Sequence, residues 1–141
     1  MKTRMLNLTI ILTLISGISF GQNQTSTDFN IDYLNGIWKN ISKFRSVNLT
    51  YTKSVEIEKD YVGFIMEFKA DGKVVSRNII KSVRCGNDLR RIPRKGEWNF
   101  DNETGILETI MENRISGTQT VQSYKILELY SNKLVMERIT E

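Results

Sequence analysis

The sequence predicts an all-β protein, in which eight antiparallel strands close an up-and-down barrel behind a signal peptide. Three observations lead to this fold class. The N-terminus is basic and then apolar, the rest of the chain alternates apolar and polar side chains in short segments, and most connections are short enough for hairpins. No segment after the apolar N-terminus keeps a helical period for more than about two turns, which argues against helical and mixed folds.

Residues 1–21 have the three parts of a signal peptide. Lys2 and Arg4 form the basic start, residues 5–18 are mostly apolar, and Ser19-Phe20-Gly21 puts small residues at the positions that a signal peptidase reads. We therefore expect a cleaved, exported protein that is periplasmic or secreted. The alternative is a membrane anchor, but the apolar run is shorter than the roughly 20 residues of a transmembrane helix, so we expect no stable membrane span after cleavage.

The expected mature chain has a flexible polar leader, residues 22–33, and one domain, residues 34–141. A chain of this length can build one hydrophobic core but not two. Loss of Lys2 and Arg4 leaves 18 basic against 16 acidic residues, a net charge of +2. This weak charge argues against nucleic acid as a partner, because nucleic-acid-binding domains normally carry a concentrated basic face.

The residue types that are missing restrict the chemistry. The chain has no histidine, which excludes a Ser-His-Asp triad, a histidine general base and a histidine metal site. Cys85 is the only cysteine, so neither an internal disulfide nor a structural zinc cluster can form. Its thiol is either buried and inert, or reactive and open to an intermolecular bridge. We expect a protein without catalysis, cofactor or metal ion.

The segments follow one another from a single helical turn at residues 31–34. Alternating side chains predict strands at residues 36–44, 53–59, 61–69, 73–83, 96–101, 106–111, 119–129 and 134–140. Asp71-Gly72 is a hairpin signal, and residues 102–105 have the glycine of a type I turn with a bulge. Broken alternation at residues 78–81 predicts a bulge or a bend there.

The connections decide between a barrel and a sandwich. Residues 45–52 read as a polar connection, and residues 84–95, with the only proline, form the longest irregular segment. The remaining connections are hairpin-sized. A sandwich needs crossovers between its sheets, so short connections favour an up-and-down barrel.

Several short motifs resemble the lipocalins. They are Gly36-Ile37-Trp38, a second Gly-x-Trp at Gly96-Glu97-Trp98, the Asp71-Gly72 hairpin, and the ending formed by residues 124–129 and 132–135. Over residues 35–140 the chain is similar to small exported lipocalin-like domain proteins of Gram-negative bacteria. This resemblance implies a calycin-type barrel in which Trp38 closes the base and packs against a basic residue of the last strand. Arg138 is at the position expected for that partner.

Two groups of residues are candidates for binding. If the strand faces point inward, large side chains converge to form either a filled interior or the walls of an apolar ligand pocket. These are Phe64, Met66, Phe68, Trp98, Phe100, Tyr124 and Met136. The second group is basic and consists of Arg84, Arg90, Arg91, Arg94 and Lys95. It either closes over an anionic group, such as a fatty-acid carboxylate, touches an anionic surface, or is only a solvated loop.

These residues support two hypotheses of function. The first is an exported, non-catalytic barrel that binds a small hydrophobic molecule of lipid-like and anionic character. The alternative is a structural or interaction domain of the cell envelope, with a filled core, that contacts a protein or an anionic polymer. The volume of the interior distinguishes them, and it depends on strand tilt and register, which the sequence does not fix.

Overall fold

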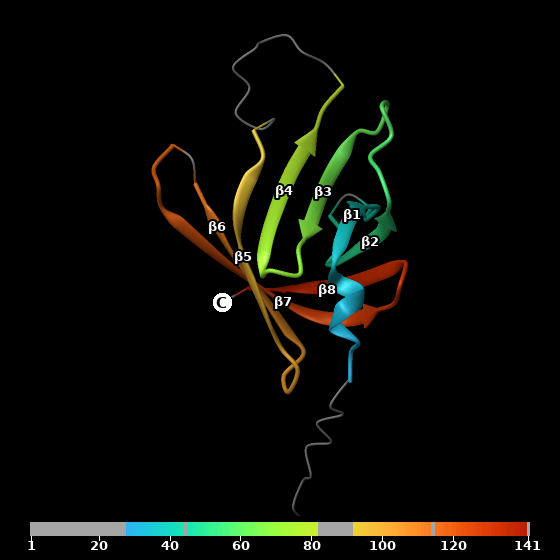
Figure 1. Cartoon of the computed structure of the whole chain (residues 1–141), viewed down its shortest axis with the longest axis vertical. Coiled ribbons are helices and arrows are strands. Elements are labelled where there is room, and N and C mark those ends of the chain that lie inside the picture. Colours follow the sequence, from blue (N-terminus) through green and yellow to red (C-terminus); the bar gives the residue numbers. More distant parts are fainter. Residues whose placement is uncertain (1–27, 44, 82–91, 114, 141) are drawn as a thin grey trace, which may run out of the picture.

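The computed structural model describes residues 28–43, 45–81, 92–113 and 115–140. Within them lie one 3₁₀ helix and eight strands (Figure 1). In chain order they are η1 (Ile31–Leu34), β1 (Gly36–Asn40), β2 (Asn48–Ser54), β3 (Gly63–Phe68), β4 (Lys73–Ile79), β5 (Arg94–Asp101), β6 (Ile106–Glu112), β7 (Gln119–Leu129) and β8 (Lys133–Ile139). The predicted signal peptide, the first part of the leader and the segment with Cys85 lie outside the described residues.

The eight strands form one closed barrel, and every neighbouring pair is antiparallel. This confirms the predicted all-β barrel of eight antiparallel strands. The order around the barrel is β1-β2-β8-β7-β6-β5-β4-β3, so β1 lies between β2 and β3 and the closing pair is β2–β8. The chain therefore departs from a simple up-and-down order at one place: β2 and β3 are not neighbours, and the connection between them has to cross β1.

That connection, residues 55–62, is called the strap below. It runs from the end of β2 back to the start of β3 along the outside of β1, where it covers Lys39. The Lys39 ammonium group pairs with the carboxylate of Glu58 and lies 5.3 Å from the centroid of the Tyr61 ring. The Tyr61 hydroxyl donates a hydrogen bond of 3.1 Å to the carbonyl of Phe64. The strap thus buries the Lys39 ammonium group on the outer face of β1 and supplies the carboxylate and the aromatic ring that stabilise its charge.

Two of the expected boundaries are wrong near the strap. The second strand occupies Asn48–Ser54, most of which was expected to be a polar connection, and the strand expected at residues 53–59 is mostly strap. Val55 is 99% exposed. In β2, Leu49 and Tyr51 face the interior and threonines occupy the outer positions, so the segment forms a strand although it is polar overall. The strap alternates apolar and polar residues, but it pairs with no neighbouring strand.

Two further findings concern the ladders. The β3–β4 ladder runs without interruption to the pair Gly63–Ile79, so β4 has no bulge, and the bulge or bend predicted at residues 78–81 is a bend at Lys81, just beyond the strand. The register shift occurs instead in β7, between Ile126 and Glu128. Strand β5 begins at Arg94, so Arg94 and Lys95 belong to the wall of the barrel and not to the preceding irregular segment.

Both predicted glycine turns are confirmed. Gly72 has a φ of 79°, and its amide donates to the carbonyl of Lys69 at 3.1 Å. Gly105 has a φ of 70°, and its amide donates to the carbonyl of Asp101 at 2.8 Å. A positive φ is readily adopted only by glycine, which explains why each turn has one at this position.

The core fills the lower half of the barrel, the end at which η1 and the β5–β6 hairpin lie in Figure 1. The fully buried side chains there include Leu34, Trp38, Phe68, Val74, Leu107, Leu134 and Met136. Helix η1, predicted as a single turn, places Leu34 across this end. Phe29, assigned to the leader, packs edge-on against Phe100 with ring centroids 6.2 Å apart. The last six leader residues, 28–33, therefore belong structurally with the barrel.

Candidate functional site

The upper half of the barrel contains a cavity of about 700 Å³. This volume is within the usual range of small-molecule sites. The cavity exists because the inward positions become smaller along the strands: Val74 is followed by Ser76 in β4, and Leu107 by Thr109 in β6. The lower half of the barrel is thus filled, and the upper half is hollow.

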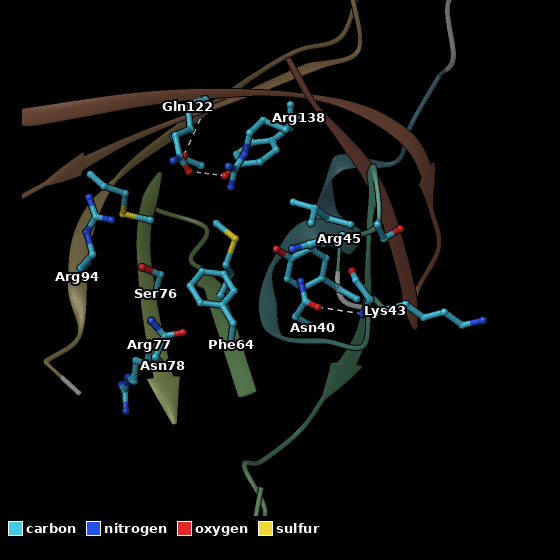
Figure 2. A pocket seen from close by; sticks show the side chains of 18 of the residues that line it. Asn40, Lys43, Arg45, Phe64, Ser76, Arg77, Asn78, Arg94, Gln122 and Arg138 are labelled. Atoms are coloured by element: carbon cyan, nitrogen blue, oxygen red, sulfur yellow. Dashed lines mark hydrogen bonds between the residues drawn. The ribbon is translucent and has the colours of Figure 1, made fainter. Parts of the chain in front are cut away.

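The floor and walls of the cavity are largely apolar or aromatic. Their side chains are Leu49, Tyr51, Phe64, Met66, Met111 and Tyr124. Of the seven pocket residues predicted from the sequence, Phe64, Met66 and Tyr124 line the cavity. The structure places Phe68, Trp98, Phe100 and Met136 in the core beneath it or packed against that core. Figure 2 shows the ring of Phe64 projecting into the cavity.

The rim of the cavity is basic. Five basic residues line it: Lys43, Arg45, Arg77, Arg94 and Arg138. No acidic residue lines it in the part of the chain that the structure describes. They come from the β1–β2 connection and from strands β4, β5 and β8, so they surround the opening. In Figure 2 Arg94 and Arg138 lie on opposite sides of Ser76, while Lys43 extends away from the cavity.

Only part of this rim corresponds to the basic group predicted from the sequence. Arg94 lines the cavity, but Lys95, the next residue in β5, points to the outer surface and lines a separate shallow groove. Arg84, Arg90 and Arg91 lie outside the described residues. The sequence offered one signal for Arg138, because Met136 and Arg138 are two residues apart and therefore share a strand face.

Hydrogen-bonding groups lie between the basic rim and the apolar floor. The Tyr124 hydroxyl donates to Oε1 of Gln122 at 2.5 Å, and the Thr109 hydroxyl donates to the carbonyl of Gln122 at 3.4 Å. Burial raises the pKa of Tyr51 to about 12, although its hydrogen bond with Asn40 and the nearby charge of Arg138 lower it. Tyr51 is therefore neutral at physiological pH, and none of the described residues that line the cavity carries a negative charge.

The pairing of Trp38 with Arg138, implied by the resemblance, is not found. The cation over the Trp38 ring is Lys53, whose Nζ is 5.3 Å from the ring centroid. Arg138 lies opposite Tyr124 in the β7–β8 ladder and lines the cavity. Strand β8 begins at Lys133, at the base of the barrel, and Arg138 is five residues further on. Arg138 is therefore roughly 16 Å along the strand from the base, where Trp38 lies. Trp38 itself does close the base, because its indole Nε1 donates to the carbonyl of Leu34 at 2.6 Å.

Two observations bear on other kinds of site. Among the described residues there is no group of three or more cysteine, aspartate or glutamate side chains that could hold a metal ion. In the same residues, no helix has the length and apolar character needed to cross a membrane.

The cavity offers cationic, hydroxyl and amide groups over an apolar floor, which suits the binding of an amphipathic molecule.

No protein-family model, no curated protein and no solved structure matches the chain.

Proposed function

We propose that this protein is an exported, lipocalin-like, non-catalytic binding protein whose cavity holds one small molecule with an apolar body and an anionic group. The observation that carries this proposal is the composition of the cavity. Its floor is apolar and aromatic, whereas its rim has five basic side chains and, among described residues, no acidic one. A long-chain fatty acid, or another lipid-like acid of that size, has this division of polarity.

The expected orientation follows from the layers of the site. The apolar body lies on Met66, Met111 and Phe64, because burying its surface there removes it from water. The anionic group lies at the rim, between Arg94 and Arg138. Neither guanidinium has an ion pair within the described part of the chain. An anion placed there gains charge-assisted hydrogen bonds.

The lipocalin-like assignment and the export are parts of the same proposal. A closed barrel of eight antiparallel strands, with Trp38 at its base, is consistent with the lipocalin resemblance, although β1 lies between β2 and β3 instead of next to β8. The basic and apolar N-terminus supports export, which would place the cavity in the periplasm or outside the cell.

The test is a titration with a fluorescent polyene fatty acid and with the alcohol of the same chain length. The wild-type mature protein is expected to bind the acid more tightly than the alcohol. Arg138→Ala and Arg94→Ala are each expected to weaken binding of the acid by about tenfold, which corresponds to one charge-assisted hydrogen bond, and to leave binding of the alcohol nearly unchanged.

Lys95→Ala is the matched control for this titration. Lys95 is the neighbour of Arg94 in β5, has the opposite orientation and carries the same charge, so its removal changes the net charge without changing the cavity. Equal affinity for acid and alcohol, or an equal effect of all three substitutions, would contradict the proposed anion site. Failure of the wild type to bind either probe would instead favour an interaction domain.

A further inference from the structure

The open end of the barrel carries exposed apolar side chains that the cavity does not explain. Ile41 and Val47, which are 58% and 72% exposed, are in the β1–β2 connection. Ile115, which is 74% exposed, is in the β6–β7 connection. Both connections lie at the end of the barrel opposite η1, and Figure 1 shows the β6–β7 connection at the upper end. Ile41 and Val47 therefore flank one loop at the open end, and Ile115 lies in the turn of another.

Basic side chains accompany these exposed aliphatic residues. Lys43 lies between Ile41 and Val47 in the same connection, and Figure 2 shows that it extends away from the cavity. Arg77 and Arg94 lie on the facing strands, and within the described residues neither they nor Lys43 form an ion pair. Within the described ranges, acidic residues at this end include Asp60, Glu112 and Glu137, and none of them lines the mouth.

We propose that this open end docks on the surface of a bilayer that contains anionic phospholipids. The exposed aliphatic side chains of these connections enter the boundary between headgroups and acyl chains, and neighbouring Lys and Arg side chains pair with the negative headgroups. At this end both features surround one opening, whereas at the base the exposed Val55 and the lysine Lys69 lie on different connections. The charge of the rim is what favours a lipid surface over an apolar protein partner, since an apolar groove on a protein would leave these cations unmatched.

In the docked orientation the mouth of the cavity faces the bilayer. Helix η1 and the base of the barrel, which Trp38 closes, then point away from it. Docking does not require that the cavity holds a ligand. A barrel that binds fatty acids in solution but ignores vesicles is a coherent outcome, and so is the reverse, so this inference can fail independently of the proposed function.

The experiment is flotation of the mature protein with vesicles of phosphatidylcholine alone and of phosphatidylcholine mixed with phosphatidylglycerol. The wild type is expected to float with the mixed vesicles and to be released by high salt, because salt screens exposed charges. Lys43→Ala and Arg77→Ala are each expected to lower the partition coefficient about fivefold. Ile41→Ser and Ile115→Ser are each expected to lower it about tenfold.

The control substitutions are at the opposite end. Val55→Ser removes an aliphatic side chain that is even more exposed, at the end of β2 near the base. Lys69→Ala removes a charge from the hairpin between β3 and β4, also at the base. Both are expected to float like the wild type. The inference is overturned if the wild type does not bind the mixed vesicles, if it binds neutral vesicles equally well, or if the base substitutions weaken flotation as much as those at the mouth.

Discussion

The ammonium group of Lys53 lies 5.3 Å from the centroid of the Trp38 indole. The two residues are direct partners in the β1–β2 ladder. The same ammonium group donates a hydrogen bond of 2.8 Å to the carbonyl of Tyr33 in η1. Trp38 is tied to η1 as well, through its bond to the carbonyl of Leu34. The base of the barrel is therefore closed by two side chains of adjacent strands that hold one helical turn.

The first prediction concerns stability at this base. Trp38→Phe removes a buried hydrogen bond and leaves part of the indole volume empty, so the free energy of unfolding is expected to fall by about 2–4 kcal/mol. Arg138→Ala is expected to change it by less than about 0.5 kcal/mol, because Arg138 is exposed at the other end. Urea denaturation followed by tryptophan or tyrosine fluorescence measures both. A large loss of stability in the Arg138 variant would contradict this expectation and support the pairing of Trp38 with Arg138 that the resemblance implies.

The second prediction is a dependence of stability on pH that comes from the strap. The hydrogen bond from Lys39 holds the pKa of Glu58 below its ordinary value of 4.5. A carboxyl group whose pKa is lower in the folded than in the unfolded state stabilises the fold above the unfolded pKa, and this stability is lost as the pH falls through the folded pKa. The free energy of unfolding is thus expected to decrease as the pH falls below 4.5.

Glu58→Gln is expected to lower stability at neutral pH and to make this decrease shallower. Glu56→Gln is the control, since Glu56 is also exposed in the strap but has no ion pair in the described part of the chain. Its acid profile is expected to follow the wild type. Identical profiles for both variants would show that the Lys39–Glu58 pair does not fasten the strap.

Asp101 is expected to contribute to the same loss of stability at acid pH, because a hydrogen bond from the Thr104 hydroxyl lowers the pKa of Asp101.

The third prediction separates two reasons for glycine. Gly72 is needed for its φ of 79°, and a Cβ there would meet only the carbonyl oxygen of Trp98 at an ordinary 3.7 Å. Gly72→Ala is therefore expected to cost about 1–2 kcal/mol. A Cβ at Gly96 would lie 2.0 Å from the carbonyl oxygen of Ile110, so β5 and β6 would have to separate. Gly96→Ala is expected to cost more than about 3 kcal/mol. The reverse order in thermal unfolding would contradict this packing of β5 on β6.

The fourth prediction fills the cavity from within. Ser76 is buried in the wall of the cavity, next to open volume. Ser76→Phe is expected to weaken binding of a fatty-acid probe by more than about tenfold while changing the free energy of unfolding by less than about 1 kcal/mol, because the ring enters space that is not occupied by protein. Ser76→Ala is the control and should bind like the wild type. Unchanged affinity in the phenylalanine variant would place the ligand elsewhere.

The sequence predicted the class of the fold because alternation and turn glycines act locally. Seven of the eight strands lie where alternating segments place them, and Gly72 and Gly105 take the positive φ that their turns require. The strand order was not predictable from local pattern. A strap of eight residues reaches roughly 26 Å when extended, which is enough to cross β1 from one end to the other, but its length does not tell whether it does so.

The site was predicted in part, for a related reason. Alternation identified Phe64, Met66 and Tyr124 as inward side chains, but it did not show that Phe68 and Met136 fill one half of the barrel while Ser76 and Thr109 leave the other half open. That division depends on which inward residues share a level, and levels are set by the register between strands. Lys39 and Glu58 were missed because their contact depends on the path of the strap.

The most direct test of the binding function is native mass spectrometry of the mature protein purified from its own host under non-denaturing conditions. We expect a species heavier than the bare chain by one small acidic molecule, which organic extraction removes and which is depleted in an Arg94→Ala, Arg138→Ala double variant but retained in Lys95→Ala. A bare mass for the wild type, together with no gain of fluorescence from fatty-acid probes, would contradict the proposal that the cavity is a binding site.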